Sequence, residues 1–313
     1  MALDEKEFKK KMDEVKEKLQ KSVIVPEQLT RKSRIKFRCY PGIGCFTKCC
    51  SGIRINLTPY DIYRLKNRLG ISSHDFLLKH TVPGSIDGTP LPIVVLKLQD
   101  DAEKSCPFVT PEGCTVYTDR PVTCRYYPIG MAIMKKYDRK AGEDFFIRIK
   151  EDHCLGHNEE KEWTIEEWRA DQESDLYDEM NKDWMEVVLK TKTLGIVELG
   201  QKSLDLFFMF SSNLDMVRDF IFNSNFLNAY EIDSEVITKI KEDELELLRF
   251  SLRWLRFVMY GEGDFKVKEE ARMLAKERQA VKAKEKMELK KKTEEKALSK
   301  TPEEIMKEAD HGG

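Results

Sequence analysis

The stretch Arg38–Ser51, RCYPGIGCFTKCCS, holds four of the eight cysteines of this 313-residue chain. Pro41, Gly42 and Gly44 are turn-forming residues, which let the backbone fold back so that several thiols converge without a large scaffold. In a chain of this size that shows no export signal, clustered cysteines more often bind metal or carry out redox chemistry than form disulfides. The stretch therefore predicts a metal site built from cysteine sulfur.

The spacing within this stretch indicates how its thiols are used. Cys45 and Cys49 have the spacing of a ligand pair, whereas the interval from Cys39 to Cys45 is longer than in the short hooks of zinc fingers. Adjacent cysteines do not easily point the same way in extended backbone, so Cys49 and Cys50 are candidates for two different metal sites. Eight cysteines suffice for two sites with four ligands each.

A second block of cysteines follows at wider spacing. Cys106 and Cys114 flank a Pro-Glu-Gly turn, which brings their sulfurs together. Arg120 and Arg125 bracket Cys124, and fixed guanidinium groups beside a thiolate lower its pKa and offset the charge of a bound cluster. The two arginines are therefore predicted to support a cofactor, and the alternative is a structural ion pair with an acidic residue.

The last cysteine, Cys154, has His153 and His157 beside it. Because the thiols already suffice as ligands, both histidines are interpreted as residues that surround a site or lie at the surface. Two alternating runs, Gly130–Tyr137 and Phe145–Lys150, precede them and predict a β-hairpin.

Helical signals surround the cysteines. Thr58 followed by Pro59 predicts a helix start and Gly70 its end, and Ser72 or Ser73 caps a second helix. From Trp163 onward, apolar residues recur at helical spacing. The predicted fold class is mainly α with a small β element near the cysteines (α+β).

Four regions follow from these patterns. No regular element is predicted between Ser22 and Lys36. The N-terminal twenty residues are charged throughout and no apolar run is long enough to cross a bilayer, so we expect a cytoplasmic protein without a membrane segment. The regions are 1–36, an amphipathic helix with a basic lead-in; 37–160, a cysteine-cluster metal-binding domain; 161–262, a helical region; and 263–313, a charged helical or disordered tail.

The charge pattern bears on partners. A net charge of -2 gives no global reason to expect nucleic-acid binding, and only the basic run between Arg31 and Arg38 favours an anionic partner. The Lys- and Glu-rich C-terminal tail offers a surface for a protein partner, although its apolar positions do not form heptads.

In order along the chain, the first cysteine stretch, CPFVTPEGC, YTDRPVTCRYYP and HCLG together resemble the CxxCxxCC, or YkgJ-like, family of zinc- or iron-chelating domains. The resemblance covers roughly Phe37 to His157, with first gaps of five and three residues where the family has two. It implies a set of candidate metal ligands. They are Cys39, Cys45, Cys49, Cys50, Cys106, Cys114, Cys124 and Cys154.

The resemblance implies metal binding, with zinc or iron as the cofactor. Thiolate ligands select soft ions, and the wide gaps favour an iron–sulfur cluster over zinc. The family shares its cysteine domain with proteins similar to flagellin lysine N-methylases, so a methyltransferase that uses a metal cluster is the alternative function. Whether the chain is an enzyme stays open, because no catalytic motif occurs in it.

Overall fold

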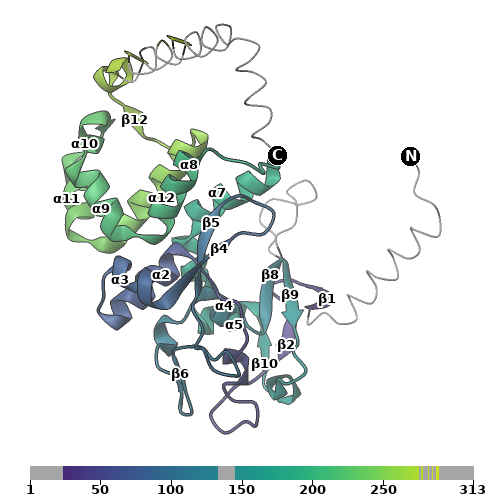
Figure 1. Ribbon diagram of the computed structural model, residues 1–313. Coiled ribbons are helices and arrows are strands. Elements are labelled where there is room, and N and C mark those ends of the chain that lie inside the picture. The colour runs from purple at the N-terminus through teal and green to yellow at the C-terminus, as the bar shows by residue number, and fades with distance from the viewer. Residues whose placement is uncertain are drawn as a thin grey trace, which may run out of the picture. The chain divides into compact units, whose positions relative to one another are not determined.

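The computed structural model describes residues 24–132 and 145–274 together with a few helical positions up to residue 288 (Figure 1). By its contacts the chain divides into two compact units. The first contains the described residues up to Asp219 together with Thr238–Gly263, and the second contains Phe220–Ile237 and the described residues from Asp264 onward. The predicted N-terminal amphipathic helix and most of the charged tail lie outside the described residues, so these two predictions and the four-region division remain untested.

Two predicted helices follow the first cysteine stretch. Helix α2, Pro59–Leu69, begins with a capping box in which the Thr58 hydroxyl accepts from the N–H of Asp61 and the Asp61 carboxylate accepts from the N–H of Thr58. It ends at Gly70, whose φ of 65° is left-handed and suits glycine. Helix α3, Ser73–His80, is capped by the hydroxyl of Ser72. The predicted start and end of the first helix and the predicted cap of the second are confirmed.

The strands form small antiparallel sheets. The predicted hairpin is confirmed where the chain is described, because β8 pairs with β9 from Ile129 opposite Arg148 to Ala132 opposite Phe145. Strand β1 adds to the other edge of β9, β2 pairs with β10, and β5 lies between β3 and β4 (Figure 1). The strands are β1 Ile24–Leu29, β2 Arg34–Lys36, β3 Asn56–Leu57, β4 Thr81–Ser85, β5 Pro92–Leu96, β6 Val109–Thr110, β7 Gly113–Cys114, β8 Ile129–Ala132, β9 Phe145–Ile149, β10 Glu162–Thr164, β11 Tyr230–Glu231 and β12 Lys266–Val267.

Helices dominate the chain after the cysteines, as predicted. They are α5 Ile165–Asp171, α6 Ser174–Met180, α7 Lys182–Thr193, α8 Gln201–Ser212, α9 Leu214–Asn223, α10 Phe226–Ala229, α11 Ser234–Glu242 and α12 Glu244–Tyr260. Short helices within the cysteine region are η1 Lys48–Cys50, η2 Tyr117–Asp119, α4 Val122–Tyr126 and η4 Leu155–Asn158. The fold class, mainly α with a small β element, is confirmed. Among the described helices, none combines the length and the apolar character that a membrane crossing needs.

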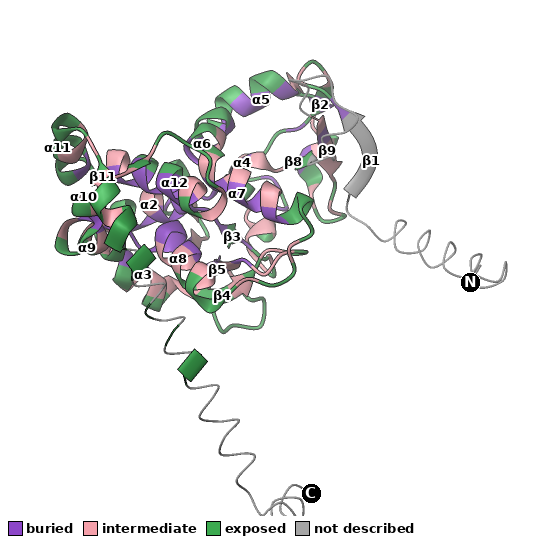
Figure 2. Cartoon of the chain, turned by 90° about the horizontal axis from the view of Figure 1, so that it is seen from above, coloured by how far each residue is buried: buried purple, intermediate pink, exposed green. Residues whose placement is uncertain are grey.

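Within the first unit, α12 packs on α7 and α8. All three helices carry buried residues, which are purple in Figure 2. The rings of Phe210 and Trp254 lie 4.6 Å apart, centroid to centroid. Helix α12 also contacts α2, where Nζ of the buried Lys66 lies 2.6 Å from both carboxylate oxygens of Glu244. Removing either partner of a buried ion pair destabilises the protein, because the other charge is left unpaired. This pair therefore holds the start of α12 on the cysteine region.

Two apolar clusters support the cysteines. One joins β3, β5, α2 and α3 and contains ten buried side chains, among them Phe76, Val94 and Phe108, with Cys106 as a member. The other joins β2, β8, β9 and α5 around Phe37 and Phe146. Both clusters reach the cysteines directly, so the thiols lie against packed cores.

Candidate metal centre

The first cysteine stretch turns at a strained residue. Thr47 adopts a left-handed φ of 66°, and the 3-10 turn η1 follows immediately, with the N–H of Cys50 donating to the carbonyl of Thr47 at 2.9 Å. Successive side chains of a 3-10 turn diverge by about 120° around its axis. Cys49 and Cys50 therefore face different neighbours, while the Cys50 thiol still donates a hydrogen bond to the Cys49 sulfur and lowers its pKa.

One set of thiols, which we call the Cys39 group, consists of Cys39, Cys45, Cys49 and Cys154. Burial and the nearby sulfurs of Cys49, Cys45 and Cys154 raise the pKa of Cys39 to about 11. Burial is also the largest cause that raises the pKa of Cys154, and Cys45 and Cys49 add to it. The N–H of Leu155 donates to Sγ of Cys45 at 3.2 Å, which ties the last cysteine to the first stretch.

The other set, the Cys124 group, consists of Cys50, Cys106, Cys114 and Cys124. Burial raises the pKa of Cys124 to about 12, and Cys106, Asp61 and Cys114 act in the same direction. The carbonyl of Cys50 accepts from the N–H of Cys106 at 2.7 Å, so the two cysteine blocks are joined through the main chain. These four cysteines lie on the ten-residue apolar cluster.

The structure thus brings all eight predicted cysteines into two groups of four, with the adjacent Cys49 and Cys50 in different groups. In the described part of the chain, however, no three His, Cys, Asp or Glu side chains stand close enough to hold an ion as they are. Binding therefore requires the sulfurs of a group to lose protons and draw together, because the thiolate is the ligand. Four thiols per group are a donor set that zinc and iron–sulfur clusters both accept, so the residues fit either cofactor.

Asp61 fixes the short helix that carries Cys124. Its side chain is fully buried, and its two oxygens accept from the N–H of Thr58 at 2.9 Å and of Val122 at 2.8 Å. Burial raises the pKa of Asp61 to about 6, although both N–H groups act in the opposite direction. The helix start at Thr58 was predicted from the sequence, but the bond from Asp61 to Val122 was not, because Val122 is 61 residues away.

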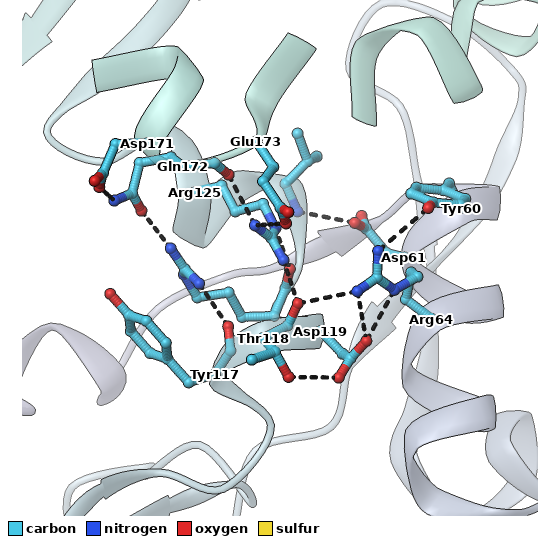
Figure 3. A network of polar contacts seen from close by, with 12 residues as sticks. Tyr60, Asp61, Arg64, Tyr117, Thr118, Asp119, Arg125, Asp171, Gln172 and Glu173 are labelled. Atoms are coloured by element: carbon cyan, nitrogen blue, oxygen red, sulfur yellow. Dashed lines mark hydrogen bonds and ion pairs between the residues drawn. The ribbon is translucent and has the colours of Figure 1, made fainter. Parts of the chain in front are cut away.

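Arg125 is enclosed in the polar network of Figure 3. Its guanidinium donates to the carbonyls of Arg120, Thr118 and Gln172, and it pairs with Glu173 at 3.1 Å. The guanidinium carbon also lies 4.2 Å from the ring centre of Tyr177. These bonds engage Nε and both terminal nitrogens of Arg125, so it joins the segment before Cys124 to the start of α6.

Arg120 is placed differently. Its guanidinium donates to the carbonyl of Tyr117 and to the side chain of Gln172. It also lowers the pKa of Cys114 and of Cys124, against the larger effect of burial. Of the two arginines predicted to support a cofactor, Arg120 therefore lies where its charge reaches the thiols.

Polar groups surround the Cys39 group; His157 was named from the sequence, whereas Tyr127 and Glu151 were not. The phenol of Tyr127 lies beside the Cys154 thiol and lowers its pKa, and Glu151 lies near both Tyr127 and Cys49. The His157 ring packs 5.2 Å from the ring of Phe37 and 6.3 Å from that of Tyr127. Burial, with Lys150 and Arg148, lowers the pKa of His157.

The basic run before the first cysteine is neutralised by acidic partners. Three of its cations form ion pairs, in part across the β2–β10 ladder. The pairs are Arg31 with Asp175 at 3.1 Å, Arg34 with Glu162 at 3.5 Å and Lys36 with Glu160 at 2.6 Å. The guanidinium of Arg38 lies over the Tyr40 ring. Paired cations present less positive charge to an anionic partner, which weakens the nucleic-acid interpretation.

Residues 38–163 match the model of the CxxCxxCC family, described as "Putative zinc- or iron-chelating domain". The match covers the cysteine-rich part of the chain, less than half of its 313 residues. The predicted family is thus confirmed, and the CxxCxxCC domain contains all eight cysteines. No curated protein and no solved structure matched the chain. The family description supports metal binding in general, by zinc or iron.

Proposed function

We propose that the CxxCxxCC domain holds two metal centres, one at the Cys39 group and one at the Cys124 group. The observation that carries this proposal is the division of eight thiols into two sets of four. Cys49 and Cys50 separate into different sets although they are adjacent. Four thiolates complete a tetrahedral zinc site or hold an iron–sulfur cluster, so eight sulfurs match two such centres.

The centres join segments that are far apart in the chain. Cys154 meets Cys39 across more than a hundred residues, and Cys50 meets Cys124 across more than seventy. A metal that binds only the folded arrangement stabilises it, so metal binding contributes directly to the stability of the domain. In this proposal Arg120 offsets thiolate charge at the Cys124 group, while Arg125 keeps the helix of Cys124 in place.

The test compares the two adjacent cysteines. The full chain is purified without oxygen, its zinc, iron and acid-labile sulfide are measured, and its visible spectrum is recorded. Cys49→Ser and Cys50→Ser are each expected to lose about half of the metal, and Cys49→Ser/Cys50→Ser is expected to lose nearly all of it. Iron with sulfide and a broad visible band identifies clusters, and a colourless zinc protein identifies zinc sites.

Two results would contradict the two-centre proposal. Wild-type protein without bound metal is one of them. The other is loss of all metal in both single variants, which is the behaviour of one shared site. A matched control is the double variant Cys45→Ser/Cys49→Ser. Both cysteines belong to the Cys39 group, so this variant should lose no more than half of the bound metal.

The methyltransferase alternative rests on the sequence resemblance alone. It predicts saturable binding of S-adenosylmethionine to the metal-loaded chain, which calorimetry measures directly. The proposed metal centres do not depend on that outcome, because a structural site and a catalytic cluster use the same thiols.

A further inference from the structure

Three unsatisfied polar atoms gather beside the Cys39 group. Among the described side chains, the hydroxyl of Tyr127, Oε2 of Glu151 and Nε2 of His157 are buried and have no hydrogen-bond partner. A buried polar atom without a partner costs free energy, and such atoms often mark the place of an ion or a water. Tyr127 and Glu151 are also the residues that act on Cys154 and Cys49.

Glu151 is held close to Cys154 by the main chain. Its carbonyl accepts from the N–H of Cys154 at 2.9 Å, so the two residues share one turn. Its carboxylate acts on the Cys49 thiol and raises the pKa of that thiol. Nε2 of His153 lies 3.4 Å from Oε2 of Glu151 and forms an ion pair only when the imidazole is protonated.

The acidic residue at the other group is in a contrasting position. Asp61 lies near Cys124, but each of its oxygens already accepts a main-chain N–H. Its carboxylate is committed to helix α4, whereas Oε2 of Glu151 is buried, accepts no hydrogen bond from the described chain and has only the His153 imidazole 3.4 Å away. A carboxylate oxygen is a harder donor than a thiolate and suits harder ions.

We propose that Glu151 supplies an oxygen ligand to the metal at the Cys39 group. The proposal rests on the proposed function and adds that the two centres differ in donor set. The Cys39 group offers sulfur and oxygen, and the Cys124 group offers sulfur alone. The mixed set shifts the preference of the Cys39 group from zinc toward ferrous iron relative to its neighbour.

The experiment uses the full chain carrying Cys50→Ser, which leaves only the Cys39 group able to bind. Cobalt(II) is added without oxygen as a spectroscopic probe, and ferrous iron competes with zinc in a separate titration. Glu151→Gln is expected to give the stronger visible bands of a four-coordinate thiolate site. It should also lower the iron-to-zinc affinity ratio about 10-fold or more, a typical effect of removing a group that tunes a metal site.

Controls separate a ligand role from a folding defect. Asp152→Asn changes the neighbouring exposed carboxylate and should leave both readouts unchanged. Metal-free Glu151→Gln should melt at the wild-type temperature, because Oε2 has no hydrogen-bond partner to lose among the described residues. Glu151→Asp keeps the carboxylate on a shorter chain and should give intermediate cobalt bands.

The outcomes distinguish the two proposals. If Glu151→Gln still binds metal and keeps the cobalt spectrum and the iron-to-zinc affinity ratio of its parent, Glu151 is not a ligand. That result would leave the proposal of two metal centres intact. Failure of the wild-type chain to bind metal at either group overturns the proposed function itself.

Discussion

The two cysteine groups have the same number of thiols but differ in what surrounds them. The Cys124 group lies on the larger apolar cluster, and its polar neighbours Asp61 and Arg120 are engaged by hydrogen bonds. The Cys39 group includes the exposed Cys39 and has unsatisfied polar atoms at Tyr127 and Glu151. The first arrangement is typical of a closed structural site, and the second leaves donors for a further ligand.

The difference indicates that two sets of four thiols can serve different roles, depending on the packing and the polar atoms around each set. Where packing and hydrogen bonds are complete, a metal mainly adds stability. Where buried polar atoms lack a hydrogen-bond partner, a bound metal can also serve as the partner of those atoms. Four predictions test this contrast, in order of expected effect.

The largest effect is expected when each group loses one cysteine. Cys124→Ser should lower the free energy of unfolding of the metal-loaded chain by about 3 kcal/mol or more, since a structural metal is lost from a packed core. Cys39→Ser removes an exposed thiol and should lose metal with a much smaller change. Metal analysis and thermal unfolding of both variants give the comparison, and equal destabilisation would show that the groups are not different in kind.

Asp61 is expected to make the stability depend on pH. A rise of its pKa from 3.8 to about 6 in the folded chain means that the folded state binds a proton more tightly than the unfolded state. The free energy of unfolding therefore contains a contribution that is full below about pH 4 and is lost as the pH rises through about 6. This contribution is on the order of 3 kcal/mol.

Asp61→Asn removes that contribution, so the stability difference between wild type and variant should change between pH 4 and pH 7. Chemical unfolding at several pH values measures it. Asp152→Asn, at an exposed carboxylate, serves as the control and should run parallel to wild type. A difference that is independent of pH would show that the Asp61 carboxylate is ionised throughout this range.

Arg125→Lys is expected to lower the free energy of unfolding by about 2 kcal/mol and to leave the metal content unchanged. Lysine keeps the charge, but it cannot donate to Thr118, Gln172 and Glu173 with the geometry of a planar guanidinium. Denaturant unfolding and metal analysis test this. Arg249→Lys is the matched control. Arg249 forms an exposed ion pair with Glu246, so this variant should hardly change the free energy of unfolding. Loss of metal without loss of stability would instead give Arg125 a role at the centre.

Local signals in the sequence were sufficient for several elements. The capping residues of α2, its terminal Gly70 and the pairing of β8 with β9 follow from turn and cap chemistry within a few residues. Strands β1 and β2 were missed, since their partners β9 and β10 lie more than a hundred residues away. Neither strand has alternation strong enough to reveal it alone, and pairing across that distance is set by tertiary contacts.

The candidate site shows the same limit. Cysteine spacing was enough to predict that Cys49 and Cys50 serve different sites, because that argument concerns adjacent residues. The membership of each group depends on which distant cysteine comes close. Cys154 belongs to the Cys39 group, and β9, which precedes it, pairs with β1, which precedes Cys39. Glu151 and Tyr127 could not be singled out, because isolated acidic and aromatic residues occur throughout the chain.

The smallest effect is expected from Tyr127→Phe. The phenol lowers the pKa of the Cys154 thiol, so its removal should weaken metal binding at the Cys39 group by about two- to threefold, less than 1 kcal/mol. The stability of the metal-free chain should hardly change, because in the described structure the hydroxyl has no nitrogen or oxygen partner and lies against the Cys154 thiol, which is a weak hydrogen-bonding group. Competition with a metal chelator measures the affinity.

Tyr126→Phe is the matched comparison, because its hydroxyl donates to Asp178 at 2.6 Å and accepts from Arg169 at 2.8 Å. That variant should lower the stability of the metal-free chain and leave the metal affinity unchanged. If Tyr127→Phe behaves like Tyr126→Phe, the phenol beside Cys154 only packs. If the two variants separate as expected, the polar groups around the Cys39 group act on the metal rather than on the fold.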